Sequence, residues 1–207
     1  MRGNRPPGHA LLQFSLLMTL LAGLLLPWLL APNAPMTLNA YDLAEWASLH
    51  PAQRATNPPL LAPLLLRAQL LILCVLVGLV ARGKLEKRAA ALVIFTLAVA
   101  QLPPIEFVND IGNLNYRQQF GLALSSLLLG MAALCWMDAR WRRLFVAGLS
   151  LLGALTTLAG ASLALDVFAS LASGGSAGLG IWIVLAGYCC LFVTGLRTLF
   201  FHILPPP

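Results

Sequence analysis

The chain has 207 residues, of which 59% are hydrophobic and only 10% are charged, and its formal net charge is +6. A soluble domain of this size is excluded, because so few polar side chains cannot cover its surface. Apolar runs of roughly 20 residues recur, which is the length that an α-helix needs to cross a bilayer. The sequence therefore predicts an all-α fold, a polytopic membrane helical bundle that forms one integral domain over residues 1–207.

The positive charge does not indicate a nucleic-acid partner. Basic side chains occur in short clusters between the apolar runs, which is the positive-inside pattern of membrane proteins. Most of the 13 Lys and Arg residues fall in segments that we expect on the inner side, whereas most of the 7 acidic residues fall on the outer side. We therefore expect both chain ends inside (N-in, C-in) in a multi-pass protein of a bacterial inner (plasma) membrane.

About six spans are predicted in chain order. The first exceeds the roughly 7–15 apolar residues of a secretion signal, and no A-x-A cleavage site follows it. We expect a retained helix there, with a cleaved signal peptide as the alternative. The third reaches Pro103-Pro104 after about 21 Å of a roughly 30 Å hydrocarbon core, so we expect this helix to be broken at 103–104. The spans are residues 10–30, 60–80, 89–108, 118–136, 144–168 and 179–200.

Residues 39–50, between the first two spans, predict a short outer helix that lies in the membrane interface. Asn39 is a suitable N-cap, and at about three turns the segment is too short to cross a bilayer. Tryptophan and tyrosine side chains are typical of the boundary between membrane and water. The residues expected at this interface are Tyr41, Asp42, Glu45, Trp46 and His50.

Arg67 is a cation inside an apolar run. By helical rise it lies about 10 Å below the outer boundary of the second span. A charge at the centre of a membrane helix costs about 2.5–3.5 kcal/mol on insertion scales, so such a residue usually faces protein and has a partner. We interpret Arg67 as an anchor for an anionic ligand group or a coupled carboxylate. A snorkelling side chain or a structural ion pair is the alternative. Gln69 lies about opposite and does not fit the same cluster.

Other polar residues fall at a similar level. Glu106 and Asp110 are spaced four residues apart, which places them on one face if the segment is helical. Ordinary loop charge is the alternative for each residue taken singly. We expect the ligand or ion-pair candidates to converge in the outer half of the bundle, and they are Arg67, Gln101, Glu106, Asp110, Arg117 and Asp166.

The sequence offers no carrier for a metal or a cofactor. The motifs HExxH, CxxCH, GxGxxG and GxxxxGK[ST] are missing, so we expect no metal and no cofactor. Gly153, Thr157 and Ala161 recur at four-residue intervals, a pattern that suits close helix packing. None of the four cysteines forms a CxxC pair and all lie in apolar runs, so we interpret them as small helix residues; they are Cys74, Cys135, Cys189 and Cys190.

Three functional hypotheses follow. The first is a non-enzymatic multi-pass membrane subunit, whose partners are the lipid bilayer and other membrane subunits. The second is a membrane transport component with a polar site in the outer half around Arg67. The third is a membrane enzyme that acts on a lipid or quinone head group with His50, Asp42 or Glu45, although nothing in the sequence fixes the geometry of these groups.

Overall fold

The computed structural model describes residues 7–31, 36–136, 139–171 and 175–203. Arg2, Arg5 and Asp138, which enter the charge pattern above, lie outside these residues. The fold is all-α, as predicted, and 81% of it is helical. Its helices are α1 (Pro7–Leu25), α2 (Ala40–Leu49), α3 (Pro51–Arg54), α4 (Leu61–Val80), α5 (Lys84–Ala100), the 3-10 helix η1 (Ile105–Val108), α6 (Leu114–Trp136), α7 (Ala139–Leu171) and α8 (Leu179–Ile203).

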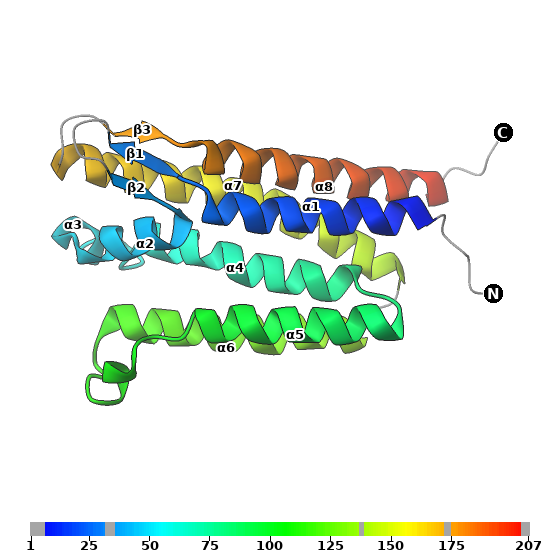
Figure 1. The fold of residues 1–207 in the computed structure, drawn as a ribbon, viewed down its shortest axis with the longest axis horizontal. Coiled ribbons are helices and arrows are strands. Elements are labelled where there is room, and N and C mark those ends of the chain that lie inside the picture. Colours follow the sequence, from blue (N-terminus) through cyan, green and yellow to red (C-terminus); the bar gives the residue numbers. More distant parts are fainter. Residues whose placement is uncertain (1–6, 32–35, 137–138, 172–174, 204–207) are drawn as a thin grey trace.

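The helices α1, α4, α5, α6, α7 and α8 lie side by side along the long axis of the molecule (Figure 1). α4 packs against α1, α5, α6 and α7, and α8 packs against α1 and α7. The start of α1, the end of α8 and the α4–α5 connection lie at one end of the bundle. α2, α3 and η1 lie at the opposite end, which we call the outer end in keeping with the predicted topology.

Four helical segments in the described part of the chain are long and apolar enough to cross a membrane. α1 contributes only a shorter apolar segment, Leu12–Leu25. α5 has 17 residues and begins with the charged sequence KLEKR, so its apolar part is shorter than the roughly 20 residues that cross a bilayer. The count of six spans and the N-in, C-in orientation therefore stay predictions. The four segments are Leu61–Val80, Leu114–Cys135, Trp141–Ala169 and Leu179–Arg197.

A small antiparallel sheet at the outer end was not predicted. Strand β1 (Leu29–Ala31) lies between β2 (Met36–Leu38) and β3 (Ser176–Ala177). The predicted first span, 10–30, is therefore too long, because the helix ends at Leu25 and the chain continues as a strand. Proline at position 27 lacks the N–H that another helical turn requires.

Small residues set the spacing of the central helices. A Cβ atom on Gly78 of α4 would lie 2.5 Å from the carbonyl oxygen of Gly130 on α6, so the two backbones approach closely there. On α7, a Cβ on Gly153 would overlap the ring of Tyr188 from α8. Thr157 and Ala161 are buried. The predicted small-residue pattern thus packs inside the bundle.

Candidate functional site

The guanidinium group of Arg67 is enclosed by side chains from two other helices. Arg67 is only 2% exposed. Its Nη2 donates to Oε1 of Glu45 at 2.7 Å, forming an ion pair with α2. Its Nη1 donates to Oδ1 of Asn115 at 2.7 Å and to Oε1 of Gln118 at 3.2 Å. Arg67, which was predicted to need a partner, therefore forms an ion pair with one carboxylate and hydrogen bonds with two neutral side chains.

Glu45 reaches Arg67 because α2 packs on the outer end of the bundle. Asn39 caps this helix as predicted, since its side chain accepts hydrogen bonds from the backbone N–H groups of Tyr41 and Asp42 at 2.9 and 3.0 Å. Leu43 is buried in the core, and α2 contacts α4 and α7. The Glu45 side chain is 36% exposed, so the carboxylate joins the buried guanidinium to the protein surface.

Glu45 also holds α6. Nε2 of Gln119 donates to the same Oε1 atom that pairs with Arg67. Asn115, Gln118 and Gln119 are spaced three and four residues apart, so they share one face of α6. We call Glu45, Arg67, Asn115, Gln118 and Gln119 the outer clamp, because these residues join α2, α4 and α6.

The turn before α4 is tied to the outer clamp. Nε2 of Gln118 donates to the carbonyl oxygen of Leu60 at 3.4 Å. Leu60 has a φ of 57°, a left-handed conformation that is uncommon for a residue with a branched side chain. The buried Gln53 supports this turn, because its carbonyl oxygen accepts from Leu60 N at 2.6 Å and its Oε1 accepts from Ala62 N at 3.1 Å.

The electrostatics of the outer clamp act on Tyr41, which precedes Glu45 by one turn of α2. Burial raises the pKa of the Tyr41 hydroxyl, and the negative charge of Glu45 raises it further. The positive charge of Arg67 acts in the opposite direction. The Tyr41 hydroxyl therefore stays neutral near pH 7 and does not act as a base there.

Four of the predicted candidates do not reach Arg67 in the structure. Glu106, Asp110, Arg117 and Asp166 are all exposed. Oδ2 of Asp110 instead accepts from Nδ2 of Asn113 at 3.0 Å. The chain turns away at Pro103-Pro104, and η1 lies at the edge of the α5–α6 pair (Figure 1). The predicted break is present, but it moves the carboxylates away from Arg67 instead of toward it.

Two further buried glutamines, Gln101 and Gln69, lie outside the outer clamp and have partners of their own. Nε2 of Gln101 donates to Oγ of Ser126 at 3.0 Å, which joins the end of α5 to α6. Nε2 of Gln69 donates to Oγ1 of Thr156 at 2.8 Å, which joins α4 to α7. Gln69 therefore lies apart from Arg67, as its helical position predicted.

Of the residues expected at the membrane interface, some are exposed and others have partners within the protein. Asp42 is exposed, and Trp46 is 45% exposed. Nδ1 of His50 accepts from Ala52 N at 3.2 Å and caps the short helix α3. Glu45, by contrast, belongs to the outer clamp. Glu45 and His50 therefore have different partners, and the described hydrogen bonds do not join His50, Asp42 and Glu45 into one acid–base group.

The role of Glu45 and the contact with Asn115 were missed from the sequence. The spacing of Asn115, Gln118 and Gln119 is the signal that indicates a polar face at the start of α6.

Within the described residues, no group of three or more His, Cys, Asp or Glu side chains is placed to hold a metal ion.

Four apolar helices around a polar cluster at one end are compatible with a protein embedded in a membrane. Comparison of the chain with protein-family models, with curated proteins and with solved structures finds no match. The functional argument therefore rests on the residues and contacts described above.

Proposed function

We propose that this protein is a non-enzymatic, multi-pass membrane subunit that packs against partner membrane proteins. The observation that carries the proposal is the closure of the outer clamp by residues of the same chain. Arg67 is already paired with Glu45 and hydrogen-bonded to Asn115 and Gln118. A cation bound in this way holds helices together and leaves little attraction for an external anion.

The surface of α5 supports this proposal. Its buried residues are Ala90, Ile94 and Ala98, a narrow strip that packs against α4 and α6. Leu92, Phe95 and Val99 lie on the opposite face and are 68%, 55% and 46% exposed. The apolar surface continues beyond the helix on three exposed side chains of the connection to α6, Ile105, Val108 and Ile111. Because α5 has only 17 residues and begins with charged ones, hydrocarbon covers this face less well than it covers the longer spans, and a partner helix would complete the cover.

A photocrosslinking amino acid at Phe95 tests this assignment in native membranes. We expect one cross-linked protein product of defined mass, because a partner helix would cover this face of α5. The matched control is Leu155 on α7, which is also 55% exposed. Position 155 should give lipid adducts only. Lipid adducts alone at both positions would contradict a partner on α5.

A transport component is the second candidate, and two atoms of the outer clamp favour it. Among the described residues, Nε of Arg67 and Oε1 of Gln119 are buried polar atoms without a hydrogen-bond partner. Both belong to side chains that bind Glu45, whose carboxylate is partly exposed. Guanidinium and amide groups do not exchange protons near neutral pH, so a proton path would run through the Glu45 carboxylate, beside which the two unpartnered atoms can hydrogen-bond a water.

Proton flux into vesicles tests the transport candidate. The purified protein is reconstituted with a pH-sensitive dye inside, and a membrane potential is applied. A transporter should acidify the vesicles, and Glu45→Gln, which cannot exchange a proton, should abolish the signal. Arg117→Gln is the control, because Arg117 is exposed. Flux no greater than in protein-free vesicles would exclude proton transport and favour the subunit.

A further inference from the structure

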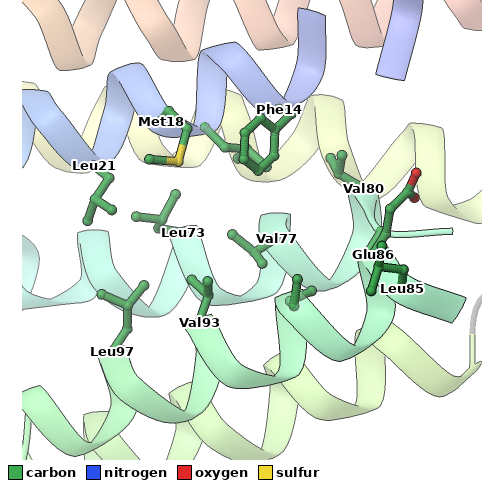
Figure 2. A pocket seen from close by; sticks show the side chains of 14 residues that line it. Phe14, Met18, Leu21, Leu73, Val77, Val80, Leu85, Glu86, Val93 and Leu97 are labelled. Carbon is green, nitrogen blue, oxygen red and sulfur yellow. The ribbon is translucent and has the colours of Figure 1, made fainter. Parts of the chain in front are cut away.

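An apolar groove opens between α1 and α5, with α4 as its floor (Figure 2). Its volume is about 440 Å³. Phe14 and Met18 line it from α1, Leu73 and Val77 from α4, and Val93 and Leu97 from α5. Apart from Glu86 at one end, the side chains that line the groove are apolar.

The groove ends beside three arginines. A second, smaller pocket is lined by Arg82, which follows α4, and by Arg142 and Arg143 near the start of α7. Val80 lines both pockets, so they adjoin. Nη1 of Arg142 donates to the carbonyl oxygen of Ala81 at 3.1 Å, and Ala81 also lines the groove.

The three guanidinium groups lie close enough to affect one another. The pKa of Arg82 is lowered by burial, and the positive charges of Arg142 and Arg143 lower it further. Guanidinium groups bind phosphate oxygens in a bidentate geometry, so three of them beside the groove suit a phosphate group. The small pocket has a volume of about 10 Å³, which suits one phosphate oxygen rather than a whole phosphate.

Among the described residues that line the two pockets, the one carboxylate, Glu86, is already engaged. Oε2 of Glu86 accepts from the backbone N–H groups of Arg82 and Gly83 at 2.8 and 3.0 Å. Glu86 thus caps the start of α5, and its negative charge also acts on Arg82, whose pKa it raises. Three arginines therefore stand against one carboxylate among the described residues that line the two pockets.

The size of the groove decides between a helix and an extended chain as its occupant. A helix about 10 Å in diameter needs about 420 Å³ for each turn of about 5.4 Å. The groove offers about 440 Å³, so it takes an extended hydrocarbon chain and not a helix.

We propose that the groove between α1 and α5 binds one acyl chain of an anionic phospholipid, whose phosphate lies against Arg82, Arg142 and Arg143. Basic pockets between membrane helices bind anionic head groups in this way, and the adjoining apolar groove would hold the chain. The lipid would fill the space between α1 and α5 and join both helices to α4.

Native mass spectrometry of the purified protein tests the proposal with two probes, palmitoyl-oleoyl phosphatidylglycerol and the matching phosphatidylcholine. We expect one phosphatidylglycerol to be retained and phosphatidylcholine to bind more weakly. Arg82→Gln should weaken phosphatidylglycerol binding about fivefold, because one cation near the phosphate is lost. Arg88→Gln is the charge-matched control, since Arg88 is exposed and lines neither pocket.

The groove is tested separately by steric blocking. Val93→Trp should fill it and reduce retention of both lipids, whereas Leu92→Trp, on the exposed face of α5, should not. A thermal melt of each variant establishes that it is folded. Inorganic phosphate at the concentration of the lipid should displace none of it, because phosphate has no acyl chain.

Three results would overturn the proposal. The first is equal retention of the two lipids that Arg82→Gln leaves unchanged. The second is full phosphatidylglycerol binding by Val93→Trp, and the third is a dimer of this chain that excludes lipid from the groove. None of these results bears on Phe95 cross-linking, so failure here is distinct from failure of the proposed subunit role.

Discussion

Arg67→Leu should destabilise the protein by about 3 kcal/mol, measured by denaturant unfolding in mild detergent. Removing one partner of a buried ion pair typically costs about 3–5 kcal/mol, because the remaining charge is left without compensation. The lower end applies here because Glu45 is 36% exposed and keeps some contact with solvent. The oxygens of Asn115 and Gln118 also lose their donor.

Two controls separate the ion pair from a general loss of charge. Arg117→Leu removes an exposed cation from the same end of the bundle and should change the stability by less than about 0.5 kcal/mol. The double variant Glu45→Leu with Arg67→Leu should be more stable than the sum of the two single changes predicts, because no isolated charge remains. Wild-type stability in Arg67→Leu would mean that Arg67 snorkels, and the outer clamp would lose its structural role.

Gly78→Val should destabilise the packing of α4 on α6 by about 3 kcal/mol, the upper end of the usual cost of overpacking. The new Cβ would lie 2.5 Å from the backbone oxygen of Gly130 and 3.0 Å from Cβ of Ala133. A backbone atom cannot rotate away as a flexible side chain can, so the two helices have to separate. The measurement is again denaturant unfolding in mild detergent.

Gly148→Val provides the matched control for this variant. Gly148 lies on α7, and a Cβ there would have no described neighbour within 4 Å. Because both changes replace a helical glycine with valine, intrinsic helix propensity contributes equally. Equal stability of Gly78→Val and Gly148→Val would contradict the close approach of α4 and α6.

The helices of this protein follow from local pattern, which is why most of them could be predicted. Apolar runs indicate α4, α6, α7 and α8, and the cap at Asn39 and the break at Pro103-Pro104 are local signals as well. The small sheet is different, because Leu29 pairs with Ala177 across most of the chain. No periodicity within residues 29–31 distinguishes this strand from the end of an apolar helix.

The sequence predicts that Arg67 has a polar or acidic partner, but it does not predict which residue that partner is. Its burial required a carboxylate or several acceptors, and the structure provides both. Glu45 was assigned to the membrane surface because an isolated α2 is amphipathic and suited to lie there. The packing of the buried face of α2 on the bundle, which includes Leu43, turns Glu45 toward α4. That contact depends on tertiary structure, which the spacing of residues in α2 does not encode.

The most direct test of the proposed subunit role is the native mass of the protein purified from its own membrane. We expect a complex heavier than the 22.1 kDa chain that contains a distinct membrane protein and is lost on substitution of Phe95 by arginine. A lone 22.1 kDa monomer, with or without bound lipid, would contradict this role.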